Sequence, residues 1–203
     1  IGGVDIVRTA FRQSKINGEN IMLHPFSGKE LEVENSDFKL IEVYLSNKIM
    51  PMMTAGLYNA ELFQSVRFPE HLCAEDMYVT FLSLYYSKKV ILTNEILYNA
   101  RENMESVTHK KIKTIDICNT WKSVRDFAIA NYLPHNIIAK VDSIIARLLY
   151  HFIRDAKLDG IRVVSIHQDA LYFINMNLNF VRRVLLRVLI LKSSIKVSAD
   201  IKK

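Results

Sequence analysis

Hydrophobic and polar positions predict short strands and turns in the first part of the chain. Residues 4–11 are apolar at most positions, as in a sheet strand, and the Asn-Gly step at 17–18 predicts a turn that lets residues 21–23 pair with them. The Ser-Asp pair at 36–37 offers a cap for a helix that continues to about residue 47. The pattern therefore predicts a sheet with helices packed on it.

The middle of the chain repeats this alternation of strand and helix. A strand is predicted at 52–58, and Asn59 is expected to cap the short helix that follows. Glu75 and Asp76 precede an apolar run, which predicts a helix with an acidic first turn. Residues 90–93 then predict another strand, so the fold class is α/β with a mixed sheet and flanking helices.

From about residue 112 onward, the spacing of apolar residues becomes helical. One helix is predicted before Pro134, and a second at 138–152 has one continuous apolar face. Apolar residues at 171–188 recur at steps of three and four, which predicts a long amphipathic helix, although 174–180 also alternates with period two and leaves a local strand open. We therefore expect two regions: residues 1–110 and a mainly α-helical extension at 111–203.

Charge is distributed unevenly between these two regions. Residues 1–109 contain 10 lysines and arginines against 14 aspartates and glutamates, a net charge of −4. Residues 110–203 contain 17 against 7, a net charge of +10. A basic region attracts phosphate groups, and here the cations are scattered among apolar stripes with no recognisable nucleic-acid module. We therefore expect an anionic membrane surface, and no nucleic acid, as a partner.

The composition further limits the compartment and the class of protein. Half of the 203 residues are apolar and about a quarter are charged, which is typical of a folded domain. The apolar run at 184–191 is too short to span a bilayer, which needs about 20 residues. Cys73 and Cys118 have no metal-ligand spacing, and each is expected to pack in a core. These features predict a cytoplasmic protein, and they leave two alternatives open for its basic tail: a peripheral position at the inner face of the membrane, or packing on the catalytic domain with the cations in solvent.

Asp76 is the first candidate for chemistry. A carboxylate at the start of a helix can face a cleft, where it can accept a proton from a hydroxyl within hydrogen-bond reach. The alternative is a structural one, because acidic residues in a first helical turn also complement the helix dipole. The pair of Glu75 and Asp76 alone does not decide between these interpretations.

The order of several short motifs around Asp76 resembles the family 2 glycosyltransferases. The resemblance covers about residues 52–109, and its specificity lies in the combination of motifs. The motifs are Leu-Tyr-Asn-Ala-Glu-Leu-Phe at 57–63, Arg-Phe-Pro-Glu at 67–70, Glu-Asp at 75–76, Ile-Leu-Tyr-Asn-Ala-Arg at 96–101 and Ser-Val-Thr at 106–108.

The resemblance implies a partial GT-A fold, which is Rossmann-related, in residues 1–110. It also implies a nucleotide-sugar donor and inversion at the anomeric carbon. It makes Asp76 the catalytic base and Glu75 its supporting neighbour, and it places Arg101 and Ser106 in a loop over the donor diphosphate. A guanidinium and a hydroxyl suit that task, because both donate hydrogen bonds to phosphate oxygens.

Three features depart from the family pattern. Ala100 replaces an aromatic residue before the arginine, and Glu105 adds a negative charge beside the expected phosphate loop. No Asp-x-Asp motif precedes Asp76, although the family uses one to hold a divalent Mn or Mg ion. We therefore expect the metal ligands to lie mostly in an absent N-terminal half, with His109 as a possible ligand in this chain, and the isolated chain to be inactive.

Two functions follow from these observations. The first is an inverting transferase that moves a sugar onto a hydroxyl of a glycan or lipid-linked acceptor in surface polysaccharide or lipopolysaccharide biosynthesis. The second is a non-catalytic helical interaction or membrane-surface module attached to a transferase remnant. An upstream Asp-x-Asp motif would favour the enzyme.

Overall fold

The computed structural model divides the chain into two compact units, residues 1–112 and residues 113–203. The sequence pattern predicts the boundary between the two units between residues 110 and 111. The mixed α/β class and the helices flanking a mixed sheet are as predicted. The structure describes residues 3–15, 17–24, 31–70, 72–103, 114–158, 165–167, 173–174, 176–179, 182–183, 185 and 196–198.

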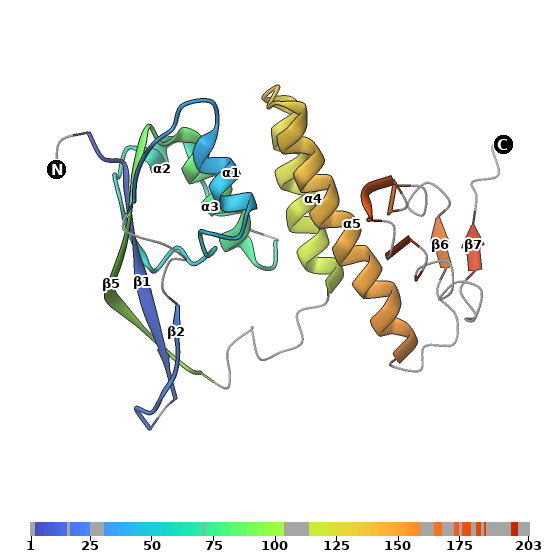
Figure 1. The fold of residues 1–203 in the computed structure, drawn as a ribbon, viewed down its shortest axis with the longest axis horizontal. Helices are drawn as coiled ribbons and strands as arrows, with labels where there is room; N and C mark the ends of the chain where they lie inside the picture. Colours follow the sequence, from blue (N-terminus) through green and yellow to red (C-terminus); the bar gives the residue numbers. More distant parts are fainter. Residues whose placement is uncertain are drawn as a thin grey trace. The chain divides into compact units, whose positions relative to one another are not determined.

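Strand β1 is the centre of the five-stranded sheet in the first unit (Figure 1). One edge of β1 pairs in parallel with β5, and the other edge pairs antiparallel with β4 near its start and with β2 near its end. Strand β3 completes the sheet by pairing antiparallel with β5. The strands are β1 (Ile6–Ser14), β2 (Asn20–His24), β3 (Leu31–Glu34), β4 (Gly56–Tyr58) and β5 (Lys89–Arg101).

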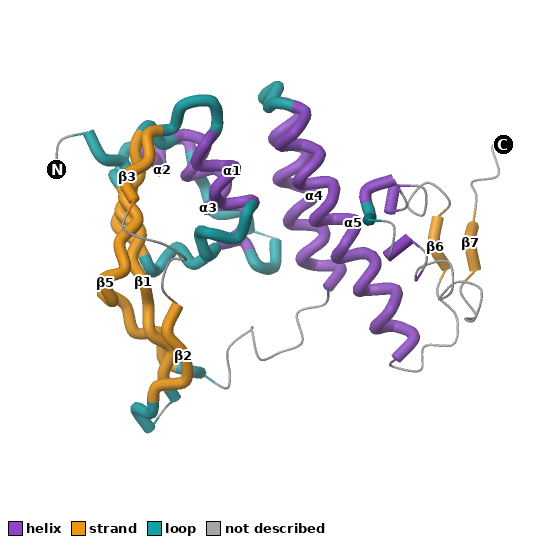
Figure 2. The backbone as a smooth tube through the Cα atoms, in the orientation of Figure 1, coloured by secondary structure: helices purple, strands orange, loops and turns teal. Residues whose placement is uncertain are grey.

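Three helices lie on one face of this sheet (Figures 1 and 2). They are α1 (Lys39–Leu45), α2 (Leu62–Ser65) and α3 (Glu75–Tyr86). Their apolar residues are buried with those of the strands because a sheet face and a helix stripe both need cover from water. The side chains with almost no exposed surface include Ile6, Leu40, Ile41, Val79, Phe81 and Val90.

The structure confirms several predicted elements of the first unit and changes others. The 20–24 strand pairs with β1 across the predicted turn, and α3 begins at Glu75 as expected. The strand at 52–58 is shorter than predicted, because residues 53 and 54 form a turn and only 56–58 pair with β1. Strand β3 was not predicted, since its two glutamates weaken the strand pattern.

The predicted cap of α1 by the pair at 36–37 is wrong. Residue Phe38 precedes the helix in a left-handed conformation and makes no side-chain capping bond. The Oδ1 atom of Asn35 instead accepts from the Leu40 amide at 3.4 Å, and its Nδ2 atom donates to the carbonyls of Leu84 at 3.0 Å and Ser87 at 2.8 Å. Asn35 therefore ties the start of α1 to the end of α3.

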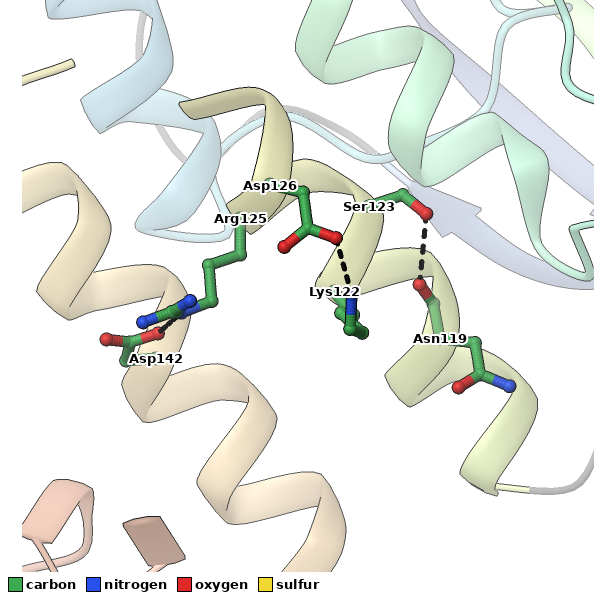
Figure 3. Close-up of polar contacts among 6 residues, drawn as sticks. All are labelled: Asn119, Lys122, Ser123, Arg125, Asp126 and Asp142. Carbon is green, nitrogen blue, oxygen red and sulfur yellow. Dashed lines mark hydrogen bonds and ion pairs between the residues drawn. The ribbon is translucent and has the colours of Figure 1, made fainter. Parts of the chain in front are cut away.

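The second unit contains a helical hairpin of α4 (Thr114–Ala130) and α5 (His135–Leu158). The two helices bury apolar residues between them, among them Trp121, Val124, Val141 and Ile145. Arg125 on α4 pairs with Asp142 on α5 through a 2.5 Å contact, while Lys122 and Asp126 pair along α4 (Figure 3). Both predicted helices are confirmed, and Pro134 separates them as expected.

The last part of the chain departs from the predicted long helix at 171–188. Leu178 and Asn179 are not helical, whereas residues 176–177 and 182–183 are, and the Oδ1 atom of Asn179 accepts from the Arg182 amide at 3.0 Å. Strands β6 (Ser165–His167) and β7 (Lys196–Ser198) pair in parallel and were not predicted. Most of the basic, apolar tail lies outside the described residues.

The two cysteines differ in burial. Cys118 is buried, as predicted, and burial raises the pKa of its thiol to about 11, whereas Cys73 is exposed and the prediction of a core role for it is wrong. Within the described parts of the chain, no helix combines the length and the apolar character needed to cross a membrane.

We expect Asn35→Ala to destabilise the first unit. The substitution removes the hydrogen bonds that join α1 to α3 and leaves carbonyls in a partly buried place without a donor, at a cost of about 1–3 kcal/mol. Urea unfolding followed by a probe in the first unit measures this loss. Asn131→Ala is the control, because the Asn131 side chain, just beyond α4, donates only a local hydrogen bond to the Phe127 carbonyl, and equal losses for the two variants would contradict the role of Asn35.

Candidate functional site

Asp76 lies in the first turn of α3, partly exposed at the edge of the first unit's core. The helix starts abruptly because Ala74 adopts a left-handed conformation with φ 58° and makes no side-chain cap. The backbone amide of Met53, in the segment that leads to β4, is one of the groups that lower the pKa of this carboxyl. The start of α3 and the 50–58 segment therefore lie near each other.

The pKa of the Asp76 carboxyl is raised above its ordinary value of 3.8. Burial is the main cause, since it disfavours the charged form, and the adjacent negative charge of Glu75 raises the pKa further. The Met53 amide and the positive charge of Arg8 act in the opposite direction. Asp76 is therefore a stronger base than an ordinary aspartate, and two neighbours stabilise its ionised form.

Arg8 is the charged group beneath this site. It lies on β1 and is 2% exposed. Its guanidinium donates one hydrogen bond to the hydroxyl of Tyr58 and another, of 2.5 Å, to the carbonyl oxygen of Met50. A buried cation is costly unless it is paired, so these contacts and the nearby carboxylate of Asp76 compensate for its loss of water.

Met53 connects the 50–58 segment to α3 through its side chain as well. Its Sδ atom lies 3.4 Å from the hydroxyl of Tyr58 and 3.5 Å from the hydroxyl of Thr80, which is one turn beyond Asp76 on α3. Gly56 makes this packing possible, because a Cβ atom there would lie 3.1 Å from the Tyr58 hydroxyl and 3.2 Å from the Arg8 side chain. The 50–58 segment is thus packed against Arg8 on β1 and against Thr80 on α3.

Tyr44 is the second tyrosine near Asp76. Tyr44 on α1 is 4% exposed and donates a 2.9 Å hydrogen bond to the carbonyl oxygen of Met77. Burial raises the pKa of Tyr44, the positive charge of Arg8 lowers it, and the negative charge of Asp76 raises it again. The pKa of Tyr58 responds to the same two charges. Arg8, Tyr44, Tyr58 and Asp76 therefore form one electrostatically linked cluster.

The structure places Glu75 with Asp76 but separates Arg101 from them. Glu75 is the first residue of α3 and is partly exposed. Arg101 is exposed at the end of β5, where it pairs with Ser14, six residues along β1 from Arg8. At about 3.3 Å per residue, that is roughly 20 Å along the sheet from the cluster. The assignment of Arg101 to the donor diphosphate thus stays a prediction without support from proximity.

The other predicted ligands cannot be placed. Ser106 and His109 lie outside the described residues. In the part of the chain that the structure describes, no group of three His, Cys, Asp or Glu residues could hold a metal ion. The divalent metal that the resemblance implies, with its ligands expected mostly outside this chain, therefore stays a prediction, and we derive no chemical step through it.

Sequence reasoning missed Arg8, Tyr44, Tyr58 and Met53 as members of this cluster. One signal for Arg8 was available: it follows Ile6-Val7 and precedes Thr9-Ala10-Phe11, so a cation stands in the middle of an otherwise buried strand. A charge in such a position needs a partner, and Asp76 was the candidate carboxylate. The tyrosines and Met53 carry no comparable signal, because such residues usually pack in cores.

Comparison of the chain with protein-family models and with curated proteins finds no match. The site must therefore be judged on its own residues.

We expect Asp76→Asn to raise the free energy of unfolding at pH 7. The folded carboxyl has a raised pKa, so the folded state holds its proton to a higher pH than the unfolded state, and stability falls as pH rises through that interval. Asparagine has nearly the same shape and no charge to bury. The gain should shrink as the pH falls toward 3.8, where the carboxyl itself is protonated.

Urea denaturation between pH 3.5 and 7.5, an interval of about four units around the shifted carboxyl, measures this difference. Asp116→Asn is the matched control, because Asp116 is also in the first turn of a helix, α4. Its loss should cost the small stabilisation that an acidic residue gives to a helix start. A destabilised Asp76→Asn variant at pH 7 would contradict the interpretation.

Proposed function

We propose that this chain activates an acceptor hydroxyl for an inverting sugar transfer from a nucleotide-sugar donor, with Asp76 as the general base. The observation that supports the proposal is the state of this carboxyl: it is partly exposed at the start of α3 and has a raised pKa. Groups of this kind are candidates for proton transfer, because a base works best when its pKa approaches the working pH.

In the proposed reaction, the Asp76 carboxylate takes the proton of the acceptor hydroxyl. The hydroxyl oxygen attacks the anomeric carbon of the donor from the face opposite the leaving group. The bond between the anomeric carbon and the diphosphate oxygen breaks, and the nucleotide diphosphate leaves with the bonding electrons. One direct displacement inverts the anomeric centre and leaves the transferred proton on Asp76.

The neighbours of Asp76 suit this step. Arg8 and the Met53 amide favour the ionised carboxylate, which must be present before the acceptor arrives. Burial and Glu75 oppose ionisation, and so they increase the affinity of the carboxylate for a proton. Two influences thus favour the ionised form and two oppose it, and their sum raises the pKa of the carboxyl above its ordinary value.

The order of motifs from Leu57 to Arg101 is the second support for a family 2 glycosyltransferase of the GT-A type. The mixed sheet and the helix that begins at Glu75-Asp76 are compatible with that interpretation. Arg101, which the resemblance assigns to the donor diphosphate, lies at the far end of β5 from the cluster around Asp76. The proposal is therefore limited to acceptor activation, with a glycan or lipid-linked hydroxyl as the acceptor.

We expect Asp76→Asn to abolish transfer while donor binding stays close to that of the parent. The base acts on the acceptor in the transition state, so its loss should lower turnover rather than donor affinity, by roughly a hundredfold or more. The measurement is sugar transfer and donor titration in the longest form of the protein that its coding sequence specifies.

Glu75→Gln is the paired variant for this assay, because it changes the neighbouring carboxylate and leaves Asp76 in place. Its turnover should stay well above that of Asp76→Asn. Transfer by Asp76→Asn within tenfold of the parent would exclude Asp76 as the base, and the absence of transfer by the parent would favour a non-catalytic interaction module.

A further inference from the structure

A pocket lies at the C-terminal end of α3, away from Asp76. Its volume is about 830 Å³, and three aromatic residues line it: Phe38, just before α1, and Tyr85 and Tyr86 in the last turn of α3. Pockets of roughly 300–1,000 Å³ that combine aromatic side chains with a few polar groups are typical of small-molecule sites. Because the 12 residues of α3 rise about 1.5 Å each, roughly 15 Å of helix separates this pocket from Asp76. The pocket is therefore a separate candidate for ligand binding.

The aromatic rings of the pocket present their faces in two directions. The rings of Phe38 and Tyr85 are nearly parallel, with an interplanar angle of 14° and centroids 6.2 Å apart. The ring of Tyr86 stands at 84° to that of Tyr85, with centroids 4.9 Å apart. Tyr86 is 40% exposed, so a ligand can reach its ring from solvent. A ligand ring can thus lie on one aromatic face while its edge meets another.

Hydrogen bonds hold these aromatic residues in place. The Nδ2 atom of Asn35 donates to the carbonyls of Leu84 and Ser87, which flank the two tyrosines in the chain. The Ser87 hydroxyl donates to the Ser83 carbonyl at 2.6 Å. Phe38 has a left-handed backbone with φ 61°, which a bulky residue adopts only where its surroundings maintain it. The pocket is therefore formed before a ligand arrives.

The charges around the pocket favour a ligand without net charge. Glu34 and Asp37 are exposed residues of its lining. Lys88 and Lys89 also line it, but Lys89 is paired with Glu32 on the neighbouring strand. One lysine therefore stands against two carboxylates, and a phosphate group would be repelled more than attracted. Hydroxyl groups, in contrast, donate to carboxylates in short, charge-assisted hydrogen bonds.

A neutral saccharide has both of the properties that this lining selects. The C–H groups on one face of a sugar ring carry a small positive charge and pack on the negative face of an aromatic ring. The hydroxyls around the ring donate to carboxylates and accept from amines and amides. A nucleotide would match the aromatic rings equally well, but it would bring its phosphates to Glu34 and Asp37.

A smaller hollow of about 200 Å³ adjoins the pocket. Tyr86 and Lys88 belong to the lining of both. Most other residues of the hollow are polar, among them Asp5, Asn59 and Ser65, which offer further acceptors and donors to hydroxyls. Linked sugars can therefore place one ring in the pocket and the next ring across Tyr86.

We propose that the pocket at the end of α3 binds a neutral saccharide chain, with one sugar ring stacked on Tyr86, its hydroxyls bonded to Asp37, and a second ring in the adjoining hollow. The site binds and makes or breaks no covalent bond. It goes beyond the proposed transfer reaction and stands without it, because none of its lining residues belongs to the cluster around Asp76.

The test is a titration of the full 203-residue chain with maltohexaose, cellohexaose and mannohexaose, followed by nuclear magnetic resonance of the backbone amides at 85–88. At least one of the three should shift these signals with a Kd on the order of 1 mM, because a shallow site buries few ligand groups. The shift should not depend on salt, since the ligand is uncharged. The matching monosaccharide should bind more weakly, because it fills one hollow.

Two substitutions of Tyr86 test the stacking. Tyr86→Ala should weaken binding about tenfold, whereas Tyr86→Phe keeps the aromatic face and should stay within about threefold of the parent. Tyr132→Ala is the matched control, because Tyr132 is another tyrosine on the surface, 94% exposed just beyond α4. It should bind like the parent. Equal binding by folded Tyr86→Ala and the parent would overturn the proposal.

Asp37→Asn tests the class of ligand. Asparagine tolerates the left-handed backbone at this position, φ 50°, so the substitution removes the charge and keeps the fold. It should weaken saccharide binding about threefold or more, because a charge-assisted hydrogen bond becomes a neutral one. Uridine diphosphate is the anionic probe. Binding of uridine diphosphate at 85–88 that Asp37→Asn strengthens, with no saccharide bound, would make the pocket an anion site and overturn the proposal.

The outcome is separate from that of the transfer assay. Asp76→Asn should bind the saccharide as the parent does, whether or not it transfers sugar. No shift at 85–88 with any of the three hexasaccharides at about ten times the expected Kd would refute the saccharide site and leave the assignment of Asp76 intact.

Discussion

The pairing of both edges of β1 is the constraint on which the first unit depends. Asp5, just before β1, donates its amide to the Lys89 carbonyl at 3.0 Å, and its carboxylate accepts from the Lys88 amide at 2.6 Å. The turn between α3 and β5 is therefore tied to the start of β1. Because α3 and β1 are fixed at this point, the other end of α3, with Asp76, has a defined place near Arg8.

The site is a balance between groups that favour and oppose a negative charge. A fully solvated aspartate would be a weak base, and a fully buried one would be protonated and unable to accept a proton. Partial burial with one backbone amide and one buried cation avoids both extremes. Burying a charge in this way costs stability, which is a common property of catalytic sites and an uncommon one of helix caps.

The periodic elements of the fold could be predicted from sequence, and the contacts between them could not. The amphipathic pattern was sufficient for α3, α4 and α5, and the position of Asp76 followed from the acidic first turn of α3. Strand β3 is held by pairing with β5 and by the ion pair of Glu32 with Lys89, which depend on tertiary structure. The cap of α1 also depends on a distant partner, since Asn35 binds carbonyls about fifty residues further along the chain.

The parallel pairing of β1 with β5 also bears on how the chain folds as it is made. Ile6 pairs with Val90, so this edge of β1 cannot pair until a residue 84 positions later in the chain has been synthesised. At about 5–20 residues per second, a ribosome needs roughly 4 to 17 s to supply it. During that time β1 can form its hairpin with β2 and pair with β4, but its other edge stays open and can pair with a neighbouring nascent chain. Chaperone binding near the ribosome would matter most for this unit in that interval.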